Sequence, residues 1–201
     1  MIGSSSFEMS GPPGSGKSTL ARSIAASMNG IVINHDLLKS YFLSRDFSFE
    51  ESAKLTYGLD WVLAQDMLAQ GRTVIIDSVC NYDEVIERGT ALAAAQGCEY
   101  RYVECQGNDI EILDRRLRSR TSLSSQRTGV NEPPLGSTTT SGSTMSVETS
   151  RCADELDGSA LFKKWMNPRR PDSGVIAVDA TRNPHECLEF VLNALASPGV
   201  S

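Results

Sequence analysis

The sequence predicts an α/β fold in which helices cover both faces of a doubly wound, mostly parallel sheet. Short apolar runs alternate with helical patterns about five times along the chain, and this alternation is typical of strand–helix units in a parallel sheet. The apolar runs are nearly continuous, as expected for strands that are buried on both faces. With 201 residues, the chain is long enough to bury a sizeable core, and we expect one domain over 1–201.

The first half of the chain supplies three strands. The expected strands are Phe7–Met9, Ile31–Ile33 and Thr73–Ile76, and the expected helices are Ser18–Met28, Leu37–Leu43 and Phe49–Ala69. In the first helix, Leu20, Ile24 and Met28 recur at a spacing of four, which predicts one buried face.

The second half supplies two further strand–helix units after an alanine-rich helix. The expected helices are Asp83–Gln96, Asp109–Arg118 and Pro184–Leu195, and the expected strands are Tyr100–Val103 and Val175–Val178. Gly97 is a usual residue just after a helix C-terminus, and proline is common near a helix start.

The segment 121–160 interrupts this pattern as a low-complexity insertion. Its larger part, Thr121–Ser150, is half Ser and Thr and holds few apolar residues. Such a composition buries too little surface to offset the entropy lost on ordering, so we expect a mobile insertion. Two interpretations remain open: a solvated linker, or a flexible lid over an active site.

Charge and cysteine content exclude several classes of protein. The net charge is -6, which argues against a protein that coats nucleic acid, because phosphate binding needs a basic face. No apolar run approaches the ~18 residues of a membrane span, and no signal peptide is visible. The five cysteines are odd in number and include no CxxC pair, so we expect no zinc site and a cytoplasmic location.

A glycine-rich motif follows the first expected strand. Residues 11–18 match GxxxxGK[ST] between a strand and a helix, which is the context that a phosphate-binding P-loop requires. In such a loop backbone N–H groups point at phosphate oxygens and the helix N-terminus adds partial positive charge. We therefore expect a nucleoside triphosphate, with Lys17 at its β- and γ-phosphates. The residues expected to bind it are Gly11, Pro12, Pro13, Gly14, Ser15, Gly16, Lys17, Ser18 and Thr19.

Ser18 and Asp77 are the expected Mg²⁺ ligands. The Ser18 hydroxyl occupies the P-loop position that binds this ion. Asp77 ends an apolar strand that is expected to lie beside the P-loop, where a carboxylate assists Mg²⁺. The alternative is that Asp77 only caps the turn after its strand.

Asp36 is the candidate general base. It follows the second expected strand, and ligands of open α/β sheets lie at the carboxyl ends of strands. Asp36 is therefore placed to take a proton from an attacking hydroxyl. The pattern fits equally well with Asp36 as the N-cap of the next helix. We expect no catalytic role for His35, which faces solvent or packs locally, or for His185.

Four arginines gather at the end of the helix 109–118: Arg115, Arg116, Arg118 and Arg120. Cations stabilise a helix C-terminus, but this explains only one or two of them. Arg116 and Arg120 are four residues apart and are expected to share a face that points at the nucleotide. Four other basic residues, Lys163, Lys164, Arg169 and Arg170, either grip an anionic acceptor or form a solvated face. Arg45 and Arg88 are weak candidates for the acceptor site.

These motifs together resemble the small P-loop kinases of the AAA_33, zeta-toxin and polynucleotide-kinase group. The resemblance rests on residues 9–20, Asn34-x-Asp36, Ile75-Ile76-Asp77 and Arg116-Leu117-x-x-Arg120. It implies an ATP- and Mg²⁺-dependent phosphotransferase with a P-loop NTPase fold like that of nucleoside and nucleotide kinases.

The resemblance also implies roles for individual residues. Asp36 would activate the acceptor hydroxyl, Arg116 would flank the adenine, and Arg120 would contact the phosphates. Thr181, Arg182 and Asn183 would lie near the base. Kinases of this group usually carry a compact, arginine-bearing lid where this chain has its long Ser/Thr-rich insertion.

The leading functional hypothesis is a kinase that transfers the γ-phosphate of ATP to a hydroxyl of a small molecule or nucleotide. The alternatives are a polynucleotide kinase that acts on a 5′-hydroxyl end, a non-catalytic ATP-binding regulatory protein, and a toxin-like sugar-nucleotide kinase. A nucleic-acid end is the less favoured acceptor because the chain is acidic, and no membrane partner is expected.

Overall fold

The computed structural model describes residues 4–79, 82–137, 162 and 165–196. Within these residues, five parallel strands form one sheet in the order β2-β3-β1-β4-β7. The strands are β1 (Ser5–Ser10), β2 (Ile31–Asn34), β3 (Val74–Asp77), β4 (Glu99–Gln106) and β7 (Val175–Asp179). The predicted doubly wound, mostly parallel α/β fold is therefore confirmed.

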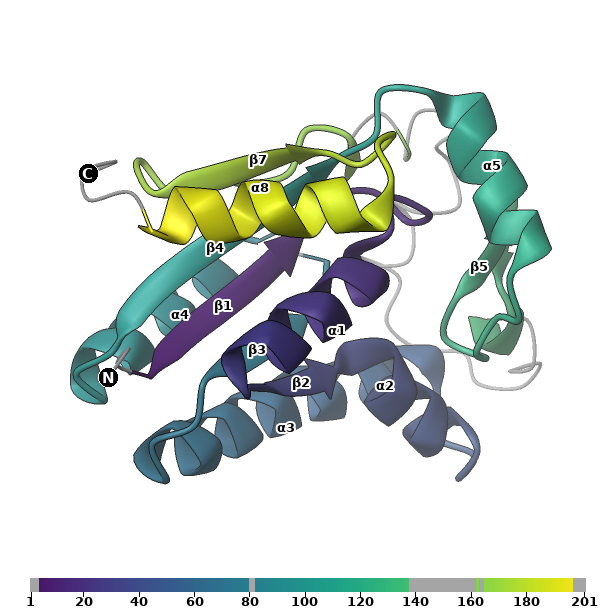
Figure 1. Ribbon diagram of the computed structural model, residues 1–201. Coiled ribbons are helices and arrows are strands. Elements are labelled where there is room, and N and C mark those ends of the chain that lie inside the picture. Colours follow the sequence, from purple (N-terminus) through teal and green to yellow (C-terminus); the bar gives the residue numbers. More distant parts are fainter. Residues whose placement is uncertain (1–3, 80–81, 138–161, 163–164, 197–201) are drawn as a thin grey trace.

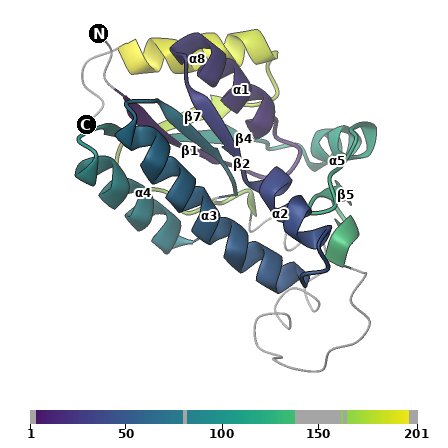
Figure 2. The ribbon, with the colours of Figure 1, turned by 90° about the horizontal axis from the view of Figure 1, so that it is seen from below.

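Helices lie on both faces of the sheet (Figures 1 and 2). Helices α1 (Lys17–Met28) and α8 (Pro184–Ala196) cover one face, and α3 (Phe49–Ala69) and α4 (Asp83–Ala95) cover the other. Helix α2 (His35–Leu43) and helix α5 (Ile110–Ser119) lie near the end of the sheet to which the strands point. Among the described residues, no helix combines the length and the hydropathy needed to cross a membrane.

Each face of the sheet has its own hydrophobic core. Phe7 and Met9 of β1 point toward α1 and α8, where Ile24 and Val191 complete a cluster of buried side chains. The opposite cluster contains Ile76 of β3, with Trp61 and other residues of α3. In β3, β4 and β7, residues of one strand enter both cores, which is why these strand sequences are largely apolar. Strand β1 differs, because Ser6, Glu8 and Ser10 are buried polar residues.

The ends of the helices follow recognisable signals. Ser48 and Glu51 form a reciprocal capping box at the start of α3, which satisfies two backbone N–H groups there. The side chain of Asp109 accepts two backbone hydrogen bonds at the start of α5. Helix α3 has the predicted bounds, and the other predicted elements differ from the observed ones by one to three residues at an end.

The first part of the predicted insertion, residues 121–137, contains regular secondary structure that its composition did not predict. A hairpin of β5 (Arg127–Gly129) and β6 (Glu132–Pro134) leads into the short helix η1 (Leu135–Ser137). Val130 is buried there with Leu113, Leu117 and Phe162, so this small apolar cluster offsets part of the ordering entropy. The rest of the predicted insertion, 138–160, lies outside the described residues.

Candidate active site

The P-loop joins β1 to α1 and has a backbone that depends on glycine. Gly11, Gly14 and Gly16 have φ values of 125°, 84° and 93°, in the left-handed region that other residues rarely adopt. A Cβ at Gly11 would lie 2.2 Å from the carbonyl oxygen of Cys105 in β4. The loop is therefore packed against β4 as well as curved, and both features require glycine at this position.

Lys17 begins α1 and is held inside the curve of the loop. Its Nζ donates hydrogen bonds to the carbonyl oxygens of Gly11, at 2.8 Å, and Pro12, at 3.0 Å. Burial lowers the pKa of Lys17, while the nearby carboxylates of Asp77 and Asp36 act in the opposite direction. The ammonium group thus lies between the phosphate loop and two acidic side chains.

Ser18 and Asp77 lie together, as predicted for the two Mg²⁺ ligands. The Ser18 hydroxyl lies close enough to the buried Asp77 carboxylate to lower its pKa, but burial is the larger effect and raises the pKa of Asp77 above its usual value. A hydroxyl and a carboxylate are oxygen ligands of the kind that Mg²⁺ prefers. No cluster of three or more His, Cys, Asp or Glu side chains suited to a metal occurs in the described part of the chain. The pair therefore fits an ion that takes its other ligands from substrate phosphates and water.

Asp36 lies in the first turn of α2 and does not cap that helix. The cap is Asn34, whose side chain accepts the backbone N–H of Leu37 at 3.1 Å. The Asp36 carboxylate instead accepts hydrogen bonds from Ser125 Oγ, at 3.0 Å, and Gln126 Nε2, at 2.8 Å. The capping interpretation is thus wrong, and both carboxylate oxygens are held by residues that precede the hairpin.

His35 does not face solvent. Its ring is buried and packs against Tyr57, with ring centroids 4.5 Å apart. Its Nδ1 lies 2.6 Å from the buried carboxylate of Asp60 on α3. His35 therefore fixes the start of α2 to α3, one residue before Asp36. His185 is exposed on α8 and lies 3.6 Å from Glu189, as expected for a residue outside the site.

Arg120 faces the acidic side chains, but it does not share a helical face with Arg116. Helix α5 ends at Ser119, and Arg120 has an extended backbone, so the spacing of four does not apply. Burial lowers the pKa of Arg120, and the charges of Asp36 and Asp77 oppose this effect. Its Nη2 donates to the carbonyl oxygen of Arg127, at 3.2 Å, which links it to the hairpin.

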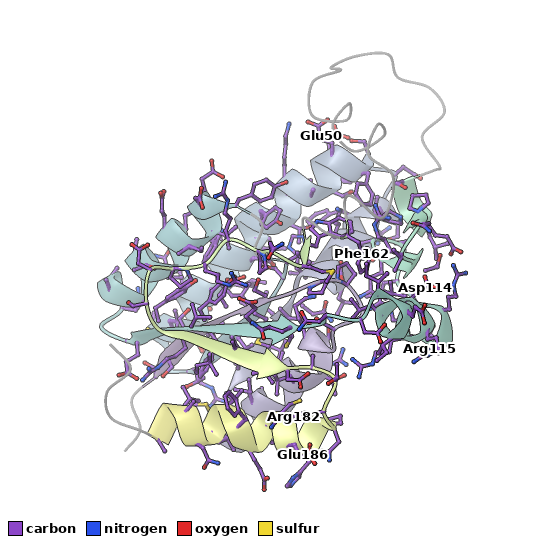
Figure 3. All side chains as sticks on the ribbon, turned by 90° about the horizontal axis from the view of Figure 1, so that it is seen from above. Glu50, Asp114, Arg115, Phe162, Arg182 and Glu186 are labelled. Atoms are coloured by element: carbon purple, nitrogen blue, oxygen red, sulfur yellow. The ribbon has the colours of Figure 1, made fainter. Side chains whose placement is uncertain are left out.

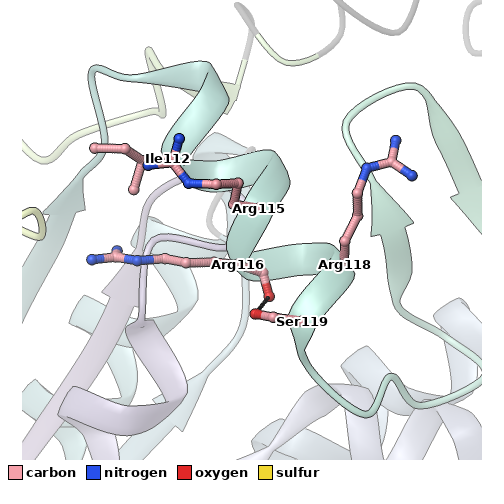
Figure 4. A pocket seen from close by; sticks show the side chains of 5 residues that line it. All are labelled: Ile112, Arg115, Arg116, Arg118 and Ser119. Carbon is pink, nitrogen blue, oxygen red and sulfur yellow. Dashed lines mark hydrogen bonds between the residues drawn. The ribbon is translucent and has the colours of Figure 1, made fainter.

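Arg116 joins α5 to the loop between β7 and α8. Its Nη1 donates to the carbonyl oxygen of Ala180 at 2.9 Å, next to the predicted base-binding residues Thr181, Arg182 and Asn183. In Figure 4, Arg116 points away from the hairpin and Arg118 points toward it. These two side chains and Ile112, Arg115 and Ser119 line a pocket on α5.

The loop 181–183 is exposed and ordered by its own side chains. Asp179 Oδ1 accepts from the backbone N–H and the hydroxyl of Thr181, and Arg182 lies 3.7 Å from the same carboxylate group. Asn183 caps α8 by accepting from the backbone of His185 and Glu186. Figure 3 shows Arg182 and Glu186 at the start of α8. The loop thus begins next to Ala180, which accepts the hydrogen bond of Arg116; its role near the base stays a prediction.

The remaining basic candidates make structural contacts. The guanidinium group of Arg45 lies over Tyr41, and that of Arg88 lies over Trp61. Arg170 Nη2 donates to the buried Glu104, at 2.8 Å, and Arg169 lies 3.5 Å from Asp83. Lys163 and Lys164 lie outside the described residues.

Four polar residues near this site were not predicted from the sequence to belong to it. Ser125 and Gln126 carry no signal in the sequence because they fall in the Ser/Thr-rich segment. Lys39 lies three residues after Asp36 on the same helix face, a spacing that could have identified it. Its Nζ lies 3.5 Å from the centre of the Phe49 ring, and burial lowers its pKa to about 8. Glu8 is fully buried on β1, where its neighbours predict only an apolar strand.

The strand order and the P-loop between β1 and α1 together define the class of protein: this is a P-loop protein with a kinase-type fold. A family model described as an AAA domain, AAA_33, matches residues 7–135. The chain belongs to the AAA_33 family, as its motifs suggested. The match includes the P-loop, Asp36, Asp77, Arg116, Arg120 and the hairpin. No curated protein matches the chain.

Solved structures of similar fold include several kinases. A presumptive kinase from Chloroflexus aurantiacus J-10-fl matches with a TM-score of 0.68 and 17% identity over 99% of this chain and 100% of that one. The APS kinase CysC of Mycobacterium tuberculosis, solved with AMPPNP and APS, has a TM-score of 0.62 and 15% identity over 98% and 100% of the two chains. A gluconokinase from Sinorhizobium meliloti 1021 has a TM-score of 0.58 and 17% identity over 98% and 94%. At these identities the likeness concerns the fold.

Proposed function

We propose that this protein is a kinase that transfers the γ-phosphate of ATP to a hydroxyl group of a small molecule, with Mg²⁺ as cofactor. One observation carries the proposal: Lys17, Asp36, Asp77 and Arg120 gather beside the P-loop at the carboxyl end of the sheet. The other three lie close enough to Lys17 for their charges to shift its pKa: the two carboxylates raise it and Arg120 lowers it. A phosphate-binding loop alone would fit any nucleotide-binding protein, but a carboxylate held on the adjoining helix supplies a general base.

In the proposed reaction the P-loop and Lys17 hold the phosphates of ATP. Lys17 and Arg120 stabilise the negative charge that spreads over the transferred phosphoryl group. Ser18 and Asp77 would hold Mg²⁺, which when bound neutralises charge on the β- and γ-phosphates. Arg116 and residues 181–183 would contact the nucleoside end.

Asp36 completes the reaction on the acceptor side. It takes the proton of the acceptor hydroxyl as the oxygen attacks the γ-phosphorus. A new oxygen–phosphorus bond forms, the bond between the γ-phosphorus and the β–γ bridging oxygen breaks, and ADP leaves. The neighbours of similar fold include a gluconokinase and an APS kinase, which supports a small hydroxylated acceptor.

Two of the basic residues that could have favoured a nucleic-acid acceptor, Arg169 and Arg170, make contacts with acidic side chains of this chain. Arg170 is paired with the buried Glu104, and Arg169 lies beside Asp83. The net charge of -6 also disfavours a long polyanion. A small molecule is therefore the acceptor class that we propose.

A labelled transfer assay tests this function. Purified protein, MgCl₂ and [γ-³²P]ATP are incubated with a panel of sugars, sugar acids, nucleosides and APS, and with an RNA oligonucleotide that has a free 5′-hydroxyl. We expect label on at least one small molecule, and we expect Lys17→Met to reduce the rate by about 10²–10³. Label on the RNA alone would support a polynucleotide kinase. ATP binding without label on any member would support the regulatory alternative and contradict the proposal.

A further inference from the structure

The segment before the hairpin holds the carboxylate of Asp36 from two sides. The single hydroxyl proton of Ser125 is shared between two acceptors, Asp36 Oδ1 at 3.0 Å and the Asp36 backbone oxygen at 2.9 Å. Gln126 Nε2 donates to the other carboxylate oxygen, Oδ2, at 2.8 Å. Each carboxylate oxygen has about two lone-pair sites. Each oxygen therefore keeps one site for the hydroxyl group of an acceptor substrate.

The amide of Gln126 is oriented by a second hydrogen bond. Its Oε1 accepts the backbone N–H of Leu123 at 3.2 Å, which directs the Nε2 donor toward Asp36. The backbone of this turn is fixed as well, because the N–H of Gly136 donates to the carbonyl oxygen of Ser124 at 2.7 Å. A Cβ at Gly136 would lie 2.8 Å from Leu43 of α2, so the turn packs closely on that helix.

Ser125 is fixed in the same way from α2. Its backbone N–H donates to Ser40 Oγ at 3.1 Å, and its own hydroxyl accepts from Ser40 Oγ at 3.0 Å. With one hydrogen bond received from Ser40, the Ser125 hydroxyl is left to donate its proton to Asp36. Ser125 is buried, so water competes little for these bonds.

The hairpin that follows is fastened to α5. Asp114 accepts the backbone N–H of Val130 at 2.8 Å, and Arg118 lies 2.7 Å from Glu132. Arg120 also donates to the backbone of the hairpin. The segment 123–136 therefore connects α2, which carries Asp36, to α5, which carries Arg116 and leads into Arg120.

We propose that Ser125 and Gln126 are positioning residues that hold the Asp36 carboxylate in the orientation needed to accept the acceptor proton. The inference rests on the proposed function, because it assumes that Asp36 is the general base. A side chain with two free torsion angles samples several directions unless it is held, and a small misplacement of a catalytic group lowers the rate strongly. The two donors fix both oxygens of the base before the substrates meet.

The test compares Gln126→Leu and the near-isosteric Gln126→Glu with the wild-type protein. The matched control is Thr128→Val, which removes a side-chain hydrogen bond to Glu132 in the same hairpin without touching Asp36. The probes are [γ-³²P]ATP with the acceptor of highest turnover in the panel, and water as acceptor if the panel gives none. The readouts are kcat, the KM for ATP and the melting temperature.

We expect both Gln126 variants to lower kcat by about 10- to 100-fold, as is typical when an orienting partner is removed. The KM for ATP should change less than about twofold, and Thr128→Val should retain wild-type kcat. In an Asp36→Asn background, Gln126→Leu should have little further effect, because residues that act as a unit are not additive. An unchanged kcat, or an equal loss with and without Asp36, would overturn the inference.

A second readout does not depend on activity. The side-chain amide resonance of Gln126 should shift when Asp36 is replaced by Asn, and it should not shift in Thr128→Val. An unmoved resonance would also refute the hydrogen bond. If Asp36→Asn itself leaves phosphoryl transfer unchanged, the proposed base role fails. If Asp36→Asn lowers kcat but the Gln126 variants leave it unchanged, the base role stands and the positioning role fails.

Discussion

At the scale of single residues, Glu8 has an unusual environment for a carboxylic acid. It is completely buried in the central strand β1. Ser78 Oγ donates to its Oε1 at 2.8 Å, and Oε2 has no hydrogen-bond partner among the described residues. Burial raises the pKa of Glu8 well above its usual value, because a charged carboxylate is poorly solvated there.

This environment makes stability depend on pH in a defined direction. The folded protein binds the Glu8 proton more tightly than the unfolded chain does. The free energy of unfolding therefore falls as pH rises from about 4.5, the ordinary pKa of the group, to the raised pKa of the folded protein. Glu8→Gln removes the titration and keeps an acceptor for Ser78. We expect its melting temperature to exceed that of the wild type by several degrees at pH 8 and to approach it at pH 5.

Glu104→Gln is the matched control for this prediction. Glu104 is buried one strand away, but it is paired with Arg170 at 2.8 Å. Its replacement removes a charge-assisted hydrogen bond and should lower the melting temperature at pH 8. The account of Glu8 is refuted if Glu8→Gln is also less stable than the wild type at pH 8 while native circular dichroism is retained.

At the scale of elements, the P-loop depends on its contact with β4. Gly11→Ala would place a Cβ 2.2 Å from the Cys105 carbonyl oxygen at a φ of +125°, so either the loop or β4 must move. We expect the variant to remain folded but to lose ATP affinity by at least about 100-fold, measured by calorimetry with AMPPNP and Mg²⁺.

Gly58→Ala provides the control for the glycine prediction. Gly58 lies within α3, and a Cβ there would meet no atom within 4 Å. Alanine is favoured over glycine inside a helix by about 1 kcal/mol, so this variant should bind AMPPNP normally and be slightly more stable. Tight AMPPNP binding by Gly11→Ala would show that the close approach to β4 is not required.

The elements also show where sequence reasoning succeeded and where it failed. Strands, helices and the P-loop were predictable because each has a local signal in apolar runs, spacing or glycine. The segment 121–137 was not, because only a few apolar residues such as Val130 order it, and they do so by contact with α5. Arg116 and Arg120 were assigned to one helical face because the spacing of four was applied beyond the predicted helix end at Arg118. Helix α5 ends at Ser119, and Arg120 is extended.

The same distinction applies to the candidate site. Lys17, Ser18 and Asp77 were identified because their positions follow from a motif and from a strand end. Asp36 was ambiguous because an acid near a helix start fits either a cap or a base. The structure excludes the cap, because Asn34 takes that position. The donors Ser125 and Gln126 lie about 90 residues away in sequence, so the pattern near Asp36 could not predict them, and the base role stays a proposal.

At the scale of the whole molecule, the sheet order brings distant parts of the chain to one edge. Strand β1 lies between β3 and β4, so the P-loop, Asp77 and the segment leading to α5 meet at adjacent strand ends. Helix α2 and the hairpin adjoin this edge (Figure 1). The fold thus brings the P-loop and the acidic residue of α2 to the same end of the sheet, an arrangement that suits the proposed transfer between two substrates.

The central claim is that Asp36 takes the proton during phosphoryl transfer from ATP. The most direct test is the rate of ³²P transfer from [γ-³²P]ATP by Asp36→Asn, measured together with AMPPNP affinity. We predict that kcat falls by about 10²–10⁴ while AMPPNP affinity changes less than about threefold, because the carboxylate acts on the acceptor. A variant that transfers phosphate at the wild-type rate would contradict the account.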